Sequence, residues 1–162
     1  MKNKLSLLLI VCIVSIIFML AVLYIKPQTV NQMFTPPPFE TEVQTGIPVV
    51  DQKLGYTTLK NDSMSFSLSI CGKPIVVGDT SEIYLTNNED NNVWIKLRVL
   101  DENSNILAET GLIKPDEYLK DIKFDVIPKD NDKIILKIMS YEIDTYYSMG
   151  TVSLNTKIKV DK

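Results

Sequence analysis

Residues 93–99 read VWIKLRV, and an apolar side chain stands at every second position. This period of two is typical of a β-strand that buries one face and leaves the other to solvent. Residues 64–70, MSFSLSI, repeat the pattern with serines between the apolar residues, and residues 151–160 repeat it near the carboxyl terminus. The pattern therefore predicts strands that share a core.

Shorter strand candidates lie between these stretches and are separated by turn-forming residues. They are Ile75–Val77, Ser81–Thr86, Ile106–Leu112, Leu119–Phe124 and Lys133–Tyr141. The sequence predicts an all-β domain, an immunoglobulin-like antiparallel β-sandwich of about seven or eight strands. An eight-stranded barrel is the alternative that the pattern leaves open.

The amino terminus has the pattern of a membrane anchor. Leu5 to Ile25 contains no charged residue and exceeds the roughly 20 residues that cross a bilayer as a helix. Its end, Phe18-Met19-Leu20-Ala21, has one small residue and no A-x-A cleavage pattern, which favours an uncleaved signal anchor. Lys2 and Lys4 precede the span, and the positive-inside bias therefore predicts a cytoplasmic amino terminus. We expect a single-pass protein of the cell membrane that contacts the lipid bilayer through residues 5–25.

Four regions follow from this assignment. Residues 1–4 form a cytoplasmic tail, 5–25 the transmembrane helix, 26–48 an extracellular linker, and 49–162 the β-sandwich ectodomain. The linker prediction rests on Pro27, Pro36-Pro37-Pro38 and Pro48 in a stretch without helical or alternating period. It is a spacer in the simplest interpretation. The other interpretation is a proline motif, flanked by Phe34 and Phe39, that serves as a ligand for a partner protein.

Composition excludes several functions. The chain has 17 basic and 20 acidic residues, a net charge of −3, which does not give the positive field that nucleic-acid binding needs. It has no histidine, and so lacks the commonest general base and zinc ligand. Its two cysteines, Cys12 and Cys71, would lie on opposite sides of a membrane boundary. A fold without disulfides outside the cell favours a bacterial source.

Few residues suggest a chemical site. Asp101–Asn105 matches the start of a calcium loop, but Ile106 stands where glycine is needed and Leu112 where a glutamate is needed, so we interpret it as a polar turn. Asn87–Asn92 could offer oxygen ligands as a less favoured alternative. Cys71 has no histidine to activate it and is interpreted as passive. We therefore expect no catalytic, cofactor-binding or metal-binding residue and no small-molecule substrate.

Three segments carry a resemblance to a known group. They are TGLIKPDE at residues 110–117, LKIMSY at 136–141, and residues 150–160 with their leading glycine. The chain from Phe66 to Lys162 resembles uncharacterised small membrane-anchored or secreted β-sandwich surface proteins of Gram-positive bacteria. It departs at Asp116, where the group usually has glycine, and at Asp130 to Lys133. The resemblance implies a fold and a compartment, and no known catalytic residues.

The alternation at residues 93–99 sends Trp94, Lys96 and Arg98 to the face opposite the core. Tryptophan and arginine are enriched in interface hot spots, so these three residues are the candidate protein-binding site. The other interpretation is structural: Trp94 is covered by the linker or a neighbouring strand, with a cation–π contact from Lys96 or Arg98.

We expect a non-enzymatic, membrane-anchored binding or scaffolding module, such as an accessory of a surface, conjugation or secretion assembly. Its partner would be an envelope or surface protein. A hydrolase or other enzyme with an unconventional site lacking histidine is the alternative class.

Overall fold

The computed structural model describes residues 13–19, 34–60 and 66–161. They belong to two compact units, Met1–Thr35 and Pro36–Lys162. In the first unit, residues 13–19 are helical. None of the helices within the described ranges combines the length and the hydrophobicity that a membrane crossing requires. The rest of the predicted anchor, residues 5–12 and 20–25, lies outside the described residues.

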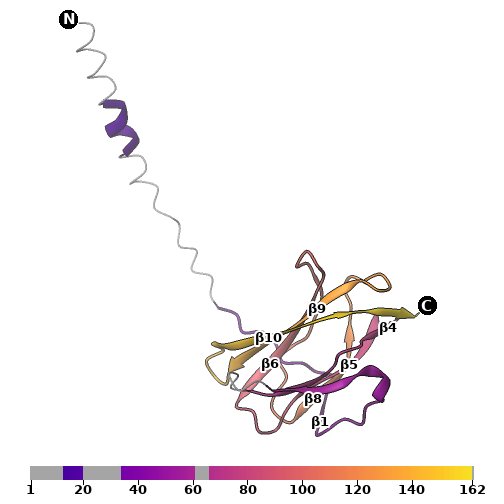
Figure 1. The fold of residues 1–162 in the computed structure, drawn as a ribbon. Coiled ribbons are helices and arrows are strands. Elements are labelled where there is room, and N and C mark those ends of the chain that lie inside the picture. Colours follow the sequence, from indigo (N-terminus) through magenta and orange to yellow (C-terminus); the bar gives the residue numbers. More distant parts are fainter. Residues whose placement is uncertain (1–12, 20–33, 61–65, 162) are drawn as a thin grey trace, which may run out of the picture. The chain divides into compact units, whose positions relative to one another are not determined.

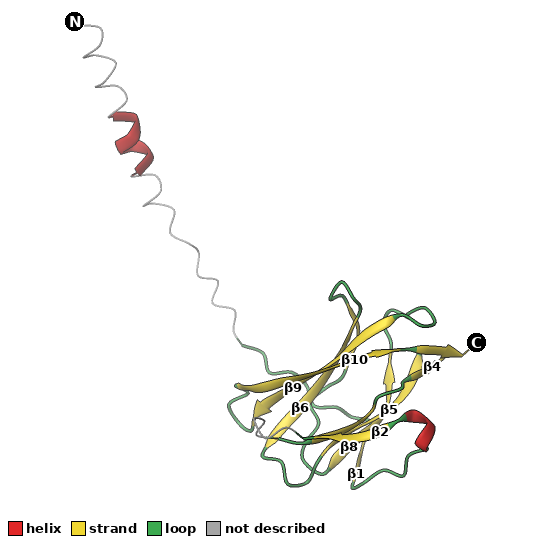
Figure 2. Ribbon diagram, viewed as in Figure 1, coloured by secondary structure: helices red, strands yellow, loops and turns green. Residues whose placement is uncertain are grey.

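The second unit is built of β-strands, drawn in Figures 1 and 2. They are β1 (Val43–Thr45), β2 (Tyr56–Leu59), β3 (Leu68–Cys71), β4 (Ile75–Val77), β5 (Thr80–Asn87), β6 (Val93–Leu100), β7 (Ile106–Glu109), β8 (Glu117–Lys123), β9 (Lys133–Glu142), β10 (Ser148–Lys157) and β11 (Lys159–Asp161). One 3-10 turn, η1 (Gln52–Leu54), precedes β2.

These strands form two sheets. The seven-stranded sheet has the order β1-β8-β5-β3-β2, and β4 joins it beside β5 with β11 paired to β4 in parallel. The four-stranded sheet has the order β10-β9-β6-β7 and is antiparallel throughout. The two layers face each other in Figure 1. The predicted all-β sandwich is therefore confirmed, and the eight-stranded barrel is wrong.

The core lies between the layers and is supplied by the predicted alternation. Val93, Ile95, Leu97 and Val99 of β6 are all buried, as are Leu68 and Ile70 of β3 on the facing sheet and Phe66 just before β3. Near the carboxyl terminus Ile158 is buried, while Val152, Leu154 and Val160 are half-buried and pack against the same cluster. The inward faces of these stretches were predicted correctly for the described residues; Met64, assigned to the same face, lies outside them.

The described residues contain eleven strands, more than the seven or eight expected. Two of the additional strands, β1 and β2, occupy residues 43–45 and 56–59, where the sequence shows no alternation. A third arises because the last predicted strand is divided at Ile158, whose N–H bonds to the Asp132 carbonyl while β11 continues beside β4. Short strands that are held by their neighbours leave little sequence pattern.

The predicted linker is partly folded. Residues 26–33 lie outside the described residues, but the compact unit begins at Pro36 rather than Val49. The N–H of Leu112 bonds to the Pro38 carbonyl at 2.9 Å, and β1 pairs with β8. The boundary was misplaced because this segment owes its extended structure to pairing with the sandwich and not to its own sequence.

Gly111 permits the segment to lie this close. Its N–H donates to Oε2 of Glu40 at 2.8 Å. A Cβ at position 111 would stand 2.5 Å from the backbone nitrogen of Glu40, which is a steric clash. A side chain here would push the segment around Phe39 and Glu40 away from the sheet.

Candidate functional site

An aromatic cluster of Phe39, Trp94 and Tyr146 lies on the side of β6 opposite the core. The ring centroids of Phe39 and Trp94 are 4.9 Å apart with an interplanar angle of 85°, and those of Trp94 and Tyr146 are 4.9 Å apart at 52°. Such edge-on and tilted arrangements stabilise ring pairs by about 0.5–1.5 kcal/mol each. The cluster is packed, yet it is not closed to solvent, since Phe39 is 36% exposed.

Three separate segments meet in the aromatic cluster. Phe39 comes from the segment before β1, Trp94 from the start of β6, and Tyr146 from the turn between β9 and β10. The turn brings Tyr146 round with a left-handed backbone, φ 62°. Lys114 adds a cation, with Nζ 4.9 Å from the centroid of the Phe39 ring. The surface therefore combines aromatic rings with a positive charge.

Lys96 and Arg98 both pair with one carboxylate. The ammonium of Lys96 contacts Oε1 of Glu109, and Nε of Arg98 contacts Oε2. Arg98 and Glu109 are direct partners in the register of β6 and β7. Burial raises the pKa of Glu109, but the hydrogen bonds and positive charges of Lys96 and Arg98 outweigh it and hold the pKa below its usual value. Glu109 is thus an anion that fixes two cations.

The three predicted site residues differ in accessibility. Trp94 and Arg98 are half-buried at the surface, whereas Lys96 is only 7% exposed and does not reach solvent as expected. Its long side chain is drawn across the sheet to Glu109. Of the described residues, the cation stacked on this cluster is Lys114, on Phe39, and not Lys96 or Arg98 on Trp94.

Sequence reasoning identified Trp94 and noted Phe39 beside the prolines, but it did not join them. It missed Tyr146, Lys114 and Glu109. The adjacent tyrosines at 146 and 147, in a turn between two predicted strands, were a usable signal for Tyr146. Glu109 had no such signal, because its pairing depends on the register between two strands.

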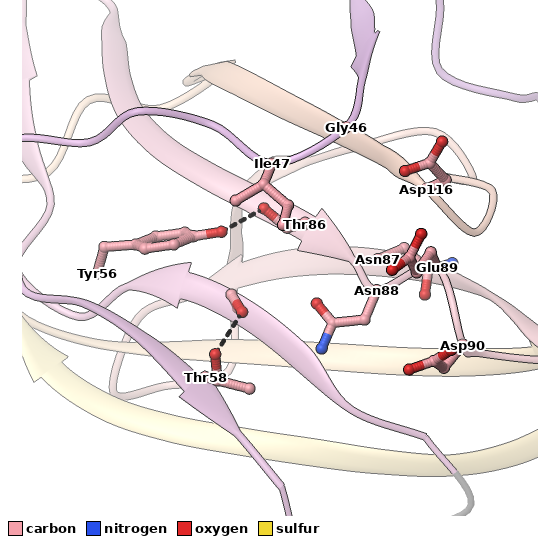
Figure 3. Close-up of a pocket in the computed structure, with 11 residues that line it drawn as sticks. Gly46, Ile47, Tyr56, Thr58, Thr86, Asn87, Asn88, Glu89, Asp90 and Asp116 are labelled. Atoms are coloured by element: carbon pink, nitrogen blue, oxygen red, sulfur yellow. Dashed lines mark hydrogen bonds between the residues drawn. The ribbon is translucent and has the colours of Figure 1, made fainter.

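A polar cavity of about 300 Å³ lies on the other sheet and is shown in Figure 3. Its lining is Gly46, Ile47, Tyr56, Thr58, Ser69, Thr86, Asn87, Asn88, Glu89, Asp90 and Asp116. Thr86 donates to the Tyr84 carbonyl at 3.1 Å, so the Tyr56 hydroxyl donates to Thr86 at 2.7 Å. The cavity thus offers acceptors and negative charge. An acidic lining alone identifies no ligand, and we assign none.

The loop Asn87–Asn92, considered above for calcium, is an amide network. Nδ2 of Asn87 donates to the carbonyls of Val93 and Ile113 at 2.9 and 3.0 Å. Its Oδ1 accepts from Nδ2 of Asn91 at 2.6 Å. These amides are used to hold the loop on the sandwich. Within the part of the chain that the structure describes, no three acidic, cysteine or histidine side chains gather as a metal site would require.

The other calcium candidate, Asp101–Asn105, is the turn between β6 and β7. Oδ1 of Asp101 accepts from the N–H groups of Asn103 and Asn105, and Oδ2 accepts from the Asn105 side chain at 2.8 Å. These bonds, with the Asn105 side chain first, lower the pKa of Asp101. The carboxylate closes its own loop, as the polar-turn interpretation predicts.

The alternation of residues 64–70 predicts that Cys71 lies towards the solvent face or at the strand end; the strand-end position is found, but the side chain lies in the interior. It is 0% exposed at the end of β3. Burial, with the charge of Glu82 as a smaller cause, raises the pKa of its thiol to about 12. The thiol therefore stays protonated at neutral pH, in agreement with a passive role.

Comparison with known proteins adds little to the description of this site. No protein-family model matches the chain, and no curated protein matches it. Among solved structures, CopC from Methylosinus trichosporium OB3b is similar over 65% of this chain and 93% of its own, with 11% identity and a TM-score of 0.33. A likeness at that level supports no statement about function.

Proposed function

We propose that this chain is a non-enzymatic binding or scaffolding module, an immunoglobulin-like sandwich held at the outer face of the cell membrane. The observation that carries the proposal is the partly exposed aromatic cluster with cations beside it. A few residues provide most of the binding energy at protein interfaces, and tryptophan, tyrosine and arginine are enriched among them. A packed cluster of rings also binds at low entropic cost because its side chains are already ordered.

The arrangement of charge indicates what such a partner would present. Lys114 stacks on Phe39, and Arg98 lies on the same strand face as Trp94 with its charge shared with Glu109. The partner is therefore an envelope or surface protein with an apolar side chain for the rings and an acidic group for Lys114.

Anchoring is supported by the sequence. The uncharged stretch from Leu5 to Ile25, with Lys2 and Lys4 before it, favours a single span with the sandwich outside. We expect protease added to intact protoplasts to digest the chain from Gln28 onward while cytoplasmic proteins stay intact, as followed by immunoblotting. Protection of the sandwich, or its release into the medium before protease is added, would contradict the anchor.

The binding surface is tested with Trp94→Ser in the full chain. We expect capture of an envelope partner from solubilised membranes to fall at least about tenfold, the loss of a hot-spot side chain. Tyr147→Ser is the matched control, because Tyr147 is 72% exposed next to the cluster and makes no ring contact in it.

Stability has to be separated from binding, since Trp94 also packs against two rings. Lys114→Ala serves this purpose: it removes one exposed cation, costs about 1 kcal/mol of stability at most, and should still weaken capture. If Trp94→Ser unfolds the sandwich and Lys114→Ala binds normally, the aromatic cluster is structural and the proposed surface is wrong.

A further inference from the structure

Among the described strands, β10 forms a free edge of the four-stranded sheet. It pairs with β9 along one side, from Ser148 to Lys157. Within residues 34–60 and 66–161, no backbone hydrogen bond joins the opposite side of Thr151 to Lys157 to another strand. The free edge ends after Lys157, because the N–H of Lys159 bonds to the Pro74 carbonyl at 3.2 Å, where β4 begins to pair with β11.

The hydrogen bonds show which residues face outward. The N–H of Ile158 bonds to the Asp132 carbonyl at 3.0 Å, so residue 158 faces the β9 side. In an antiparallel ladder this orientation alternates along the strand. Residues 152, 154 and 156 therefore bond to β9, and the N–H and C=O groups of Thr151, Ser153 and Asn155 point away from the sheet.

This edge lacks the residues that usually prevent an exposed strand from pairing with a strand of another molecule. Exposed edge strands commonly carry lysine or proline, which prevents another strand from docking. Here residues 145–156 read TYYSMGTVSLNT and contain neither a charge nor a proline. The outward side chains of Thr151, Ser153 and Asn155 are small and polar. On the core side, Val152 and Leu154 are only half-buried, so a further strand would cover them.

We propose that β10 pairs with β10 of a second copy of this chain, antiparallel about a two-fold axis at Ser153. In this register Ser153 faces Ser153 of the second copy, and Thr151 faces its Asn155. All three positions point their backbone groups at the partner, so each pair exchanges two hydrogen bonds. Val152 faces Leu154 on the core side, which joins the two half-buried apolar rows.

The strand's own sequence favours a second copy over a different protein. The pairing joins residues whose numbers are symmetric about 153, and no two charged side chains meet anywhere in it. Lys157, the nearest charge, falls opposite Met149. The same patch is therefore complementary to itself, as an isologous dimer requires, and the two four-stranded sheets become one continuous sheet.

The test introduces a charged side chain at Ser153, the residue on the proposed two-fold axis. In the full chain, solubilised in detergent, we expect the natural sequence to sediment as a dimer and Ser153→Lys and Ser153→Glu each to sediment as monomers, because like charges then stand directly opposite. An equimolar mixture of the two variants should recover the dimer, since lysine then faces glutamate. Ser148→Lys, on the same strand but outside the paired residues, should leave the dimer intact.

Each result bears on the proposal. A monomeric natural chain overturns it, as do dimers that persist in both Ser153 variants, which would place the contact elsewhere. A mixture that stays monomeric overturns the two-fold at Ser153. Recovery in the mixture also shows that the variants are folded, so loss of the dimer in the separate variants cannot arise from unfolding.

Discussion

Replacing Glu109 by glutamine should lower the free energy of unfolding by about 2–3 kcal/mol at pH 7, because it removes the counter-ion of the buried Lys96, although the Glu109 side chain itself is 29% exposed. Lys96 is 7% exposed and its ammonium contacts Glu109. Without the carboxylate, a buried positive charge has lost its counter-ion. Urea denaturation of the unit Pro36–Lys162 measures the change.

The loss should depend on pH. Because the pKa of Glu109 is lowered in the folded state, its pairing adds stability above the pKa of an unfolded glutamate, about 4.3. This stability disappears as the pH falls through the lower, folded-state pKa. The difference between the natural chain and Glu109→Gln should therefore be full at pH 7 and shrink in acid.

Glu102→Gln is the control for Glu109. It breaks the Lys133–Glu102 pair, which has the same charges at 3.0 Å but lies on the surface with side chains 66% and 64% exposed. Exposed pairs contribute about 0–1 kcal/mol. Similar losses in the two variants, or a Glu109→Gln loss that is independent of pH, would show that burial of Lys96 is not the cause.

Replacing Asn87 by alanine should cost about 3 kcal/mol, because several buried polar groups lose a partner at once. Asn87 is 0% exposed, and its amide binds the carbonyls of Val93 and Ile113 as well as the side chain of Asn91. It thereby fastens the loop after β5 to the start of β6. Urea denaturation of the same unit measures this loss.

Two variants check the Asn87 assignment. Asn87→Asp should be worse than alanine at pH 7, since a carboxylate would face two carbonyl oxygens without a proton to donate. Asn88→Ala should cost about 1 kcal/mol, because it removes one half-buried bond, from Nδ2 to the Ser67 hydroxyl at 2.8 Å. Equal effects at positions 87 and 88 would refute the role given to Asn87.

The strands of the core could be predicted because alternation is a local property. Leu68 and Leu97 were assigned inward from their neighbours alone, and both are 0% exposed. The same reasoning did not foresee that Lys96 is buried. Its neighbours put it on the outer face, which is correct, but its burial depends on Glu109 in the adjacent strand. Which side chains meet across two strands is set by register, and a single strand does not contain that information.

The sequence identified Trp94 as a site residue, but not the surface that Trp94 forms with Phe39 and Tyr146. Trp94 stood out as the tryptophan on a polar face. Phe39 belonged to a segment whose prolines suggested a spacer, and the close approach at Gly111 that brings it to the sheet is a contact between distant parts of the chain. The burial of Cys71 was not foreseen for a similar reason, since the period of β3 points its side chain outward while packing at the strand end buries it.

The entry of the chain at Phe39 determines how the protein would respond to a mechanical force. If residues 5–25 are held in a bilayer, tension on the anchor enters the sandwich at the segment pinned by Leu112 and Gly111. That segment carries Phe39, one of the three rings of the aromatic cluster. A pull between the membrane and a partner seated on Trp94 of β6 would then act across the Phe39–Trp94 ring contact and the few backbone bonds that hold this segment.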